Sequence, residues 1–256
     1  MVTRRCSWHC HNCFHGMPPA SVAGGVAVVI DVIRASTTIT TALANAAAGV
    51  VPVASVETAR ARAGQLGSGT LLGGERGGVR IDGFDLGNSP RDYTRERVAG
   101  RRIVFTTTNG TAALAACQAA ATVMIGSLVN RTAVAEAARA AATSHAAAVH
   151  LVCAGVERQV ADEDLLGAGA ILDAASRLFP DDAFDAAAIA ARQRFHDACG
   201  ADARSLAATL ATTEGGRRIA TLGMQDDLPV VAALDALAIV PQLAPEDGVL
   251  LPLSGP

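Results

Sequence analysis

The sequence predicts a three-layer α/β/α fold with a largely parallel sheet, and two observations carry this prediction. First, short runs of Val, Ile and Leu alternate with Ala-rich segments over most of the 256 residues. Strands that alternate with helices at this spacing form βαβ units, in which helices cover both faces of a parallel sheet. Second, hydrophobic residues make up 50% of the chain but aromatic residues only 3%, so aliphatic side chains must build the core.

The expected elements follow from these patterns in chain order. Short β-branched runs predict strands at residues 26–33, 50–53, 103–106, 123–125 and 147–152, with another beginning at Leu71 and a last at 237–240. Ala-rich stretches predict helices at residues 36–48, 57–66, 111–121, 130–142 and 162–178, and residues 180–213 look wholly helical. We expect residues 1–24 to be an N-terminal arm of uncertain structure and residues 25–256 to be a single domain.

Charge and hydropathy exclude several classes of partner. The net charge is -3 and no long basic run occurs, so we expect no nucleic-acid partner. No apolar run approaches the ~18 residues of a spanning helix, so we expect no membrane segment. The first residues lack the apolar centre of a signal peptide, which predicts a cytoplasmic protein whose Cys are thiols or ligands rather than disulfides. We leave open whether the protein is a homodimer.

The first segment with candidate chemistry begins at the end of the first predicted strand. Asp31 lies in an apolar strand, Arg34 follows it, and Ser36 and Thr37 begin the next predicted helix. A charged carboxylate in such a strand requires a partner or a metal, because burying it alone is costly. The helix start offers free backbone N–H groups to an anion, although Ser36 as a simple helix cap and Asp31 paired with Arg34 are the alternative.

A second polar segment follows the strand at residues 103–106. It contains Thr107, Thr108, Asn109, Gly110 and Thr111, and it precedes an Ala-rich helix. Small hydroxyl groups and Gly allow backbone and side-chain donors to converge on a phosphate. The alternative is a polar turn in which Asn and Gly only end the strand.

The third segment, residues 73–90, is a long Gly-rich loop with acidic side chains. Glu75, Asp82, Asp85 and Asn88 carry oxygen ligands of the kind that Mg²⁺ prefers, and Ser89 follows them. The alternative is a solvated loop whose carboxylates pair with neighbouring Arg residues. We therefore do not assign all four to a metal.

A fourth segment follows the strand at residues 147–152. Cys153 begins a short Cys-Ala-Gly turn, and Glu163 and Asp164 lie in the first turn of the helix after it. Acidic residues in a first helical turn also interact favourably with the helix dipole, so they do not by themselves define a site.

Together these four segments resemble the 2-phosphosulfolactate phosphatase family. The matching stretches are VVIDVIRASTTITTALANA, GGERGGVRIDGFDLGNSP, FTTTNGTAAL, and CAG with the downstream DEDLLGAGAI. The likeness is strong over residues 26–175 and poor over residues 180–213. It implies a Mg²⁺-dependent phosphoric monoester hydrolase that converts 2-phospho-3-sulfolactate, or another small anionic phosphate ester, into the hydroxy acid and phosphate.

We assign the candidate residues to three roles from the segments and the resemblance. Catalytic roles are expected for Asp31, Arg34 and Asn109, and Asp31 would be either the nucleophile or a metal ligand. Substrate binding is expected for Ser36, Thr37, Asn88, Ser89, Thr107, Thr108, Gly110, Thr111 and Cys153. Binding of Mg²⁺ is expected for Asp31, Glu75, Asp85, Glu163 and Asp164.

Two alternatives belong to other functional classes. Cys6, Cys10 and Cys13 have the C-x₃-C-x₂-C spacing of radical-SAM enzymes, and the interleaved His residues also suit zinc. The same scaffold would also serve a non-catalytic, anion-binding regulatory protein. The acidic residues beside two phosphate-like turns favour catalysis, because a simple anion-binding site gains nothing from nearby negative charge.

Overall fold

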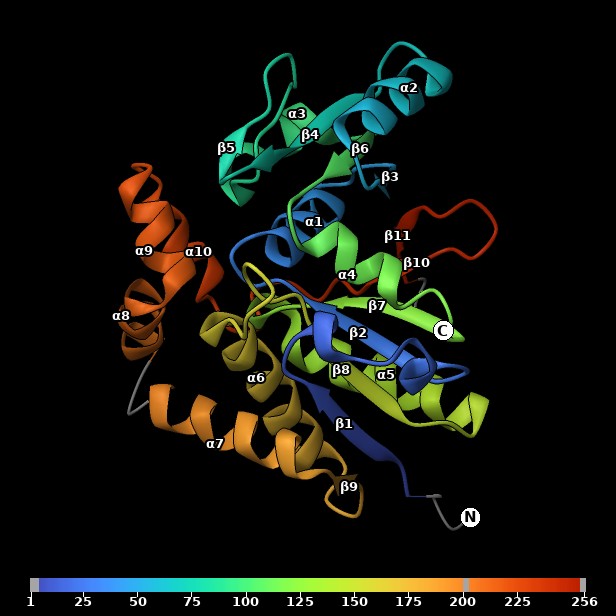
Figure 1. Ribbon diagram of the computed structural model, residues 1–256, viewed down its shortest axis with the longest axis vertical. Helices are drawn as coiled ribbons and strands as arrows, with labels where there is room; N and C mark the ends of the chain where they lie inside the picture. The colour runs from blue at the N-terminus through green and yellow to red at the C-terminus, as the bar shows by residue number, and fades with distance from the viewer. Residues whose placement is uncertain (1–4, 200–202, 254–256) are drawn as a thin grey trace.

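The computed structural model describes residues 5–199 and 203–253 and contains a mixed sheet covered by helices (Figure 1). The strands pair in the order β5-β4-β6-β3-β11-β10-β7-β2-β8-β1-β9. Their bounds are β1 Ser7–His11, β2 Val26–Ile30, β3 Gly49–Pro52, β4 Leu71–Arg76, β5 Val79–Arg80, β6 Arg102–Thr106, β7 Thr122–Gly126, β8 Val149–Cys153, β9 Ala183–Phe184, β10 Pro241–Leu243 and β11 Leu250–Pro252. The α-helices are α1 Ala35–Ala44, α2 Val56–Leu66, α3 Arg95–Val98, α4 Gly110–Ala116, α5 Arg131–His145, α6 Asp162–Leu178, α7 Ala186–Cys199, α8 Ala203–Thr212, α9 Glu214–Thr221 and α10 Leu228–Val231.

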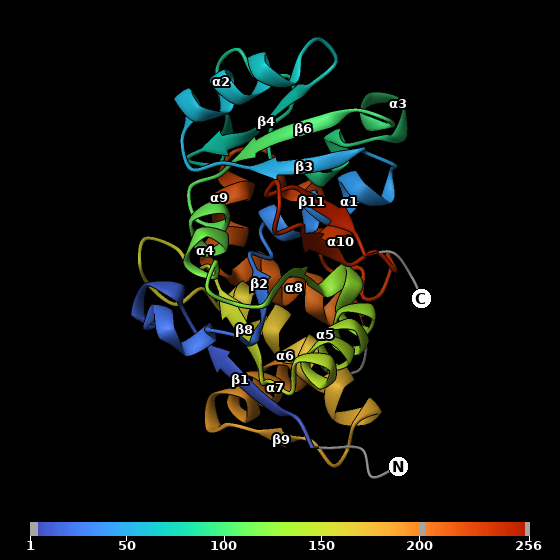
Figure 2. The same ribbon diagram turned by 90° about the vertical axis from the view of Figure 1, so that its right-hand side faces the viewer.

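The sheet consists of two parallel blocks joined by an antiparallel hairpin. Strands β4, β6 and β3 form one block, and β7, β2, β8, β1 and β9 form the other. The hairpin β10–β11 lies between them and pairs antiparallel with β7 on one side and with β3 on the other. Three antiparallel pairings in succession reverse the strand direction, so the two blocks run in opposite senses. Figure 2 shows the block of β3, β4 and β6 at one end of the molecule.

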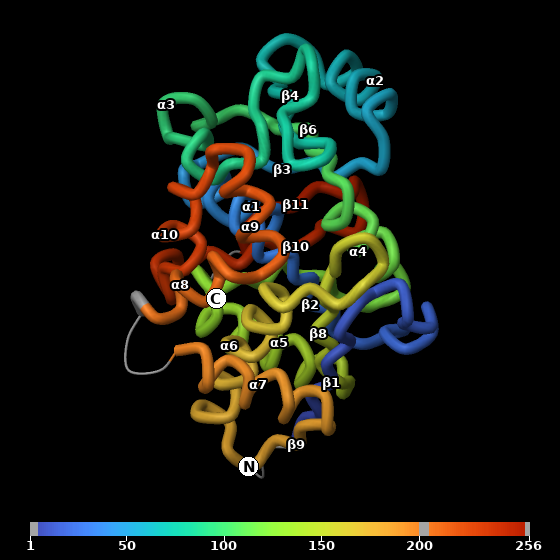
Figure 3. Tube along the Cα trace, turned by 60° about the vertical axis from the view of Figure 1, so that its left-hand side comes forward, coloured from blue at the N-terminus to red at the C-terminus, as the bar shows by residue number. Residues whose placement is uncertain are grey.

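Helices cover both faces of the larger block, which confirms the three-layer α/β/α prediction. Every residue of β2 is buried, as expected for a Val/Ile run in a parallel sheet that is covered on both sides. Alternate residues of β2 face opposite layers: Val28 packs in the core with α5, α6 and α7, whereas Val29 packs with α1 and α4. Helices α8, α9 and α10 lie together, with α9 in contact with α6 (Figure 3).

The N-terminal segment, expected as an arm of uncertain structure, contributes strand β1 to the sheet. This strand pairs parallel with β8 on one side and with β9 on the other. Trp8 is fully buried, and its indole N–H donates to Asp182 Oδ2 at 3.0 Å. Because the segment contains one of the chain's few large aromatic side chains, its burial adds substantially to the core.

Three other element predictions were wrong in detail. Residues 73–90 are not one continuous loop, because β4 extends to Arg76 and turns into β5 through Gly77 and Gly78, both of which have positive φ. Residues 237–240 form no strand, and the returning strand begins instead at Pro241. The helical prediction for residues 180–213 holds for α7 and α8 but misses the short strand β9, and residues 200–202 lie outside the described part.

Within the described residues, no helix combines the length and the apolar character that crossing a bilayer requires.

Candidate active site

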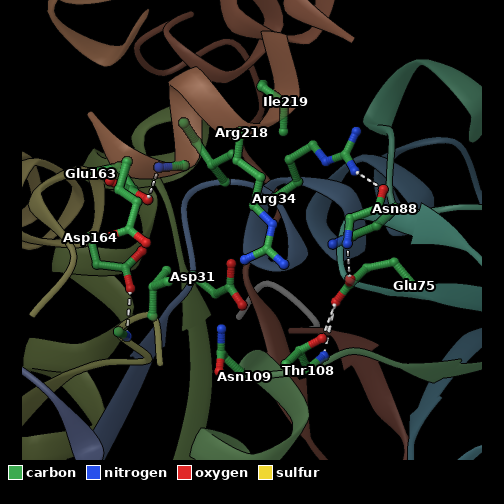
Figure 4. A pocket seen from close by; sticks show the side chains of 16 residues that line it. Asp31, Arg34, Glu75, Asn88, Thr108, Asn109, Glu163, Asp164, Arg218 and Ile219 are labelled. Carbon is green, nitrogen blue, oxygen red and sulfur yellow. Dashed lines mark hydrogen bonds between the residues drawn. The ribbon is translucent and has the colours of Figure 1, made fainter. Parts of the chain in front are cut away.

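A cavity lies where the chain leaves strands β2, β4, β6 and β8 and where helices α6 and α9 begin (Figure 4). Both blocks of the sheet therefore contribute to it. The described residues that line the cavity are Asp31, Ile33, Arg34, Glu75, Gly78, Asn88, Thr108, Asn109, Gly155, Val156, Glu163, Asp164, Glu214, Gly215, Arg218 and Ile219.

Asp31 follows β2 directly and is held by the start of α1. The Ala35 N–H donates to Asp31 Oδ1 at 3.3 Å, and the Asp31 N–H donates to Ser36 Oγ at 2.8 Å. Burial raises the pKa of Asp31 to about 7, and the nearby carboxylates of Glu75 and Glu163 act in the same direction. A carboxylate in this position favours binding of a cation, because a cation would offset both the burial and the repulsion.

Glu163 and Asp164 enter the cavity from the first turn of α6. Asp164 is almost fully buried, and its two oxygens accept the N–H groups of Val32 and Gly155, each at 2.9 Å. Burial raises the pKa of Asp164, and Asp31 and Glu163 raise it further. Asp164 therefore ties the turn after β2 to the turn after β8. Burial also raises the pKa of the Glu163 carboxyl.

Glu75 joins the end of β4 to the turn after β6. Its Oε1 accepts the backbone N–H of Thr108 at 2.9 Å and the Thr108 hydroxyl at 3.0 Å, and its Oε2 accepts the Gly78 N–H at 2.6 Å. The next residue, Asn109, lines the cavity and begins α4 without capping the helix with its own side chain. Among the described residues, the Asn109 amide has no hydrogen-bond partner, so it remains free to meet a ligand.

Gly110 leaves the space that the Asp31 carboxylate occupies. A Cβ atom at this position would lie 2.7 Å from Asp31 Oδ2 and 2.9 Å from the Ala35 Cβ. The turn after β6 and the turn after β2 thus meet directly, although four strands separate β6 from β2 in the sheet. The two turns share one cavity, to which the first contributes Asp31 and the second Asn109.

Arg34 lines the cavity but is bound to an acid that sequence reasoning did not identify. Its Nη1 donates to Asp227 Oδ2 at 2.7 Å, and both side chains are only 2% exposed. Its Nη2 donates to the Gly78 carbonyl oxygen at 2.9 Å. Ser89 donates its hydroxyl to the other oxygen of Asp227 at 2.6 Å, so Ser89 supports this ion pair and does not line the cavity.

Several predicted substrate-binding side chains point away from the cavity. Ser36 and Thr37 are buried, and their hydroxyls donate to the carbonyl oxygens of Val29 and Val32. These hydroxyls therefore support the turn around Asp31, and neither residue lines the cavity.

The same correction applies on the β6 and β8 sides. Thr107 and Thr111 are buried and bond to each other, since the Thr111 hydroxyl donates to the Thr107 carbonyl oxygen at 3.0 Å. Cys153 is fully buried in the core between the sheet and α6. The Cys10 thiol and burial both raise the pKa of Cys153, as expected for a packed thiol, and Cys153 does not line the cavity.

Asp85 does not belong to the cavity either. Its side chain is exposed, and Oδ2 accepts the Leu72 N–H at 2.8 Å beside β4. Asp85 therefore stabilises the loop after β5, and its predicted role as a metal ligand is contradicted by its position.

The remaining oxygen donors suit a hard cation that retains water ligands. Glu163 Oε2 and Asn88 Oδ1 are buried and have no hydrogen-bond partner among the described residues, and both residues line the cavity with Asp31. No three His, Cys, Asp or Glu side chains of the described chain form a ready-made metal cage. Mg²⁺ does not require such a cage, because it commonly binds one or two carboxylates together with waters and substrate phosphate.

The N-terminal cysteines do not form the cluster that an Fe–S enzyme needs. Cys6 precedes β1, which contains Cys10, and four residues of extended chain span about 13 Å. The Cys6 thiol bonds to the Ala147 carbonyl oxygen, whereas the Cys10 thiol bonds to Asn12 Oδ1. The Cys6 and Cys10 thiols therefore have different partners. No three His, Cys, Asp or Glu side chains of the described residues gather as a metal site, so the geometry gives the radical-SAM alternative no support.

Helix α9 supplies part of the cavity that sequence reasoning missed. Glu214, Gly215, Arg218 and Ile219 all line it. The Gly215 N–H donates to Glu163 Oε1 at 3.0 Å, which fixes the start of α9 against α6. No recognisable motif marks this helix, and the only sequence signal is the short polar stretch Glu-Gly-Gly-Arg-Arg beginning at Glu214.

Comparison with known proteins supports one family. The model of the family described as 2-phosphosulpholactate phosphatase matches residues 14–246. A probable 2-phosphosulfolactate phosphatase of Symbiobacterium thermophilum is 44% identical over 240 residues, covering 92% of this chain and 98% of the relative. Proteins with the same description from Deinococcus radiodurans and Synechococcus sp. (strain CC9605) are each 40% identical, covering 90% and 91% of this chain and 92% and 94% of the relatives.

Proposed function

Because this chain belongs to the 2-phosphosulfolactate phosphatase family, we propose that it hydrolyses 2-phospho-3-sulfolactate, or a similar small phosphorylated acid, with Mg²⁺ bound. The products are the hydroxy acid and inorganic phosphate. One observation supports the site assignment above all others: the unpartnered buried oxygens of Glu163 and Asn88 share a cavity with Asp31.

The residues that would hold Mg²⁺ are Asp31 and Glu163, with the Asn88 side-chain oxygen as a further donor. When bound, the ion would neutralise the carboxylates and polarise the phosphoryl oxygens of the substrate. Glu75 and Asp164 bind backbone N–H groups with both of their oxygens, so we assign them to holding the surrounding turns in place.

Asp31 has two candidate roles, and each requires a carboxylate at the end of β2. As a nucleophile it would attack phosphorus, the bond between phosphorus and the ester oxygen would break, and water would then hydrolyse the aspartyl phosphate. As a metal ligand it would leave the attack on phosphorus to water. The free Asn109 amide would donate a hydrogen bond to a phosphoryl oxygen in either case.

Phosphate release by purified protein tests this function. We expect release from 2-phospho-3-sulfolactate or 2-phospholactate in Mg²⁺, and none after EDTA treatment until Mg²⁺ is restored. If a broad panel of phosphorylated small acids released no phosphate, the protein would instead be the anion-binding alternative. Rapid acid quenching with a ³²P-labelled substrate decides the role of Asp31, because only the nucleophile would carry the label.

A further inference from the structure

The cavity contains more negative than positive groups, and this imbalance limits how it binds an anionic substrate. Among the described lining residues are five acids and two Arg. A substrate with a phosphate and a second acid group needs more than the bound Mg²⁺ to offset this charge. The position and bonding of the two guanidinium groups therefore determine which part of the substrate each can bind.

Arg34 is already committed within the protein. Its guanidinium forms a nearly fully buried ion pair with Asp227 and also donates to the Gly78 carbonyl oxygen. Its Nη1 also lies 2.8 Å from the Met224 sulfur. Removing Arg34 from Asp227 to bind a ligand would leave an unpaired buried carboxylate, which is energetically costly.

Arg218 is in the opposite situation. Its side chain reaches the cavity from α9 (Figure 4) and is exposed. It makes no hydrogen bond or ion pair with any residue in the described part of the chain. A Cβ atom at Gly77 would lie 3.7 Å from Arg218 Nη2, which places this guanidinium beside the β4–β5 turn. Arg218 is thus a free planar cation at the edge of a site for anions.

The N-terminus of α9 does not compete for this role. The Gly215 N–H binds Glu163, and the Gly216 N–H binds the Thr213 hydroxyl at 3.1 Å. These two backbone donors of the first turn are therefore occupied, and the Arg218 guanidinium is the cationic donor that this helix offers to a ligand anion.

We propose that Arg218 is the residue that selects substrates with a second acid group, by binding the carboxylate or sulfonate that is not transferred. This inference rests on the proposed function. A guanidinium suits both groups because its paired N–H donors match two oxygens of one oxyanion. The phosphate would then lie next to Asp31 and Asn109, and the acid group would lie next to Arg218 on the opposite side of the same cavity.

The experiment compares three variants on three phosphate esters. The variants are Arg218→Ala, Arg218→Lys and the control Arg217→Ala, whose residue lies on the same helix but bonds outside the cavity to the Thr212 carbonyl oxygen. The esters are 2-phospho-3-sulfolactate, 2-phospholactate without the sulfonate, and isopropyl phosphate without either acid group.

We expect Arg218→Ala to raise the KM for 2-phospho-3-sulfolactate by about 10- to 100-fold, as for loss of a hydrogen-bonded charge. The KM of Arg218→Lys should lie between those of wild type and Arg218→Ala, and Arg217→Ala should have the wild-type KM for every ester. The kcat/KM for isopropyl phosphate should remain within about twofold of wild type in all variants, since no acid group is present to lose its partner. If Arg218→Ala also raises the KM for 2-phospholactate, the carboxylate is the group that Arg218 binds. If Arg218→Ala leaves that KM unchanged, the bound group is the sulfonate.

Equal losses on all three esters, or no loss on any, would overturn the proposal. Calorimetric titration with 3-sulfolactate in the presence of Mg²⁺ provides a readout without turnover. If the wild type hydrolyses none of the esters, the proposed function fails, and the calorimetry then tests Arg218 separately. Binding that weakens in Arg218→Ala but not in Arg217→Ala supports the inference, whereas equal binding in all variants, or no binding by wild type, refutes it.

Discussion

At the residue scale, the hydrogen bonds and ion pair of Arg34 indicate a role in stabilising the fold rather than in the chemistry. The sequence places Arg34 three residues after Asp31, and a pairing of these two residues is the simplest expectation. The structure pairs Arg34 with Asp227, which comes from a distant part of the chain beside α10. Such a partner cannot be predicted from local pattern, because nothing near Asp227 indicates which buried cation it meets.

Replacing Arg34 therefore tests stability first. Arg34→Ala would leave Asp227 buried without a counter-ion, so we expect a loss of about 3–5 kcal/mol in the free energy of unfolding. The matched control is Arg91→Ala, which breaks the exposed ion pair with Asp226 and should cost about 0–1 kcal/mol. Urea unfolding of the two variants measures both values. Equal, small losses would show that the buried pair does not stabilise the fold.

Gly110 allows a second test at this scale, directed at activity. In Gly110→Ala the new Cβ would meet Asp31 Oδ2 at 2.7 Å, so Asp31 must shift and kcat should fall. The control Gly64→Ala lies within α2 and meets nothing within 4 Å, so it should raise stability by about 0.4–1 kcal/mol and leave kcat unchanged. A Gly110→Ala enzyme with wild-type kcat would show that the position of Asp31 is unimportant.

At the element scale, local pattern predicted the helices and strands well where burial and periodicity agree. Helix α6 has the predicted bounds, because three acids begin it and a continuous apolar pattern follows. The pattern failed at β1, where interleaved Cys and His obscured a strand with alternating burial. It also failed at β10, where the returning strand begins at a Pro that local rules would treat as a breaker.

The pairing of β1 with β8 places a ladder of histidines at one face of the sheet. His9 and His11 on β1 both stack on His150 of β8, with ring centroids 5.1 and 5.4 Å apart. Burial, together with the neighbouring His9 and His11, lowers the pKa of His150 to about 4, whereas Asp185 acts in the opposite direction. His150 is therefore neutral in the folded protein at neutral pH.

This neutrality makes stability depend on pH. The pKa of His150 is lower in the folded protein than its unfolded value of about 6.5. The contribution of neutral His150 to the free energy of unfolding is therefore complete above pH ~6.5 and is lost as the pH falls toward about 4. When the pH is lowered from 7.5 to 5, we expect the Tm of His150→Gln to fall by less than the Tm of the wild type. The control His15→Gln changes an exposed residue and should follow the wild type. The ladder would have no such role if His150→Gln and wild type lost the same Tm.

At the scale of the whole molecule, the site depends on how two parallel blocks meet. Sequence reasoning brought Asp31, Glu75, Asn88, Asn109, Glu163 and Asp164 together through motifs that follow strands, and all six line the cavity. It could not predict the antiparallel hairpin β10–β11 between the blocks, nor the placement of α9 over the cavity. Both features depend on contacts between distant segments, for which a single sequence carries no local signal.

We propose that this shared cavity hydrolyses phosphate esters through Asp31, whichever of its two roles applies. Burial already disfavours the charged carboxylate, so a neutral Asn should be accommodated, and we expect Asp31→Asn to fold with a Tm at or above that of wild type. The control Asp82→Asn removes an exposed acid of the loop after β5 and should retain full activity.

The decisive measurement is the initial rate of phosphate release from 2-phospho-3-sulfolactate at saturating Mg²⁺ by folded Asp31→Asn, beside wild type and Asp82→Asn. We expect Asp31→Asn to release phosphate only at the background rate, while the other two proteins turn over equally. Near-normal release by Asp31→Asn would show that Asp31 is not required and place the chemistry outside this cavity.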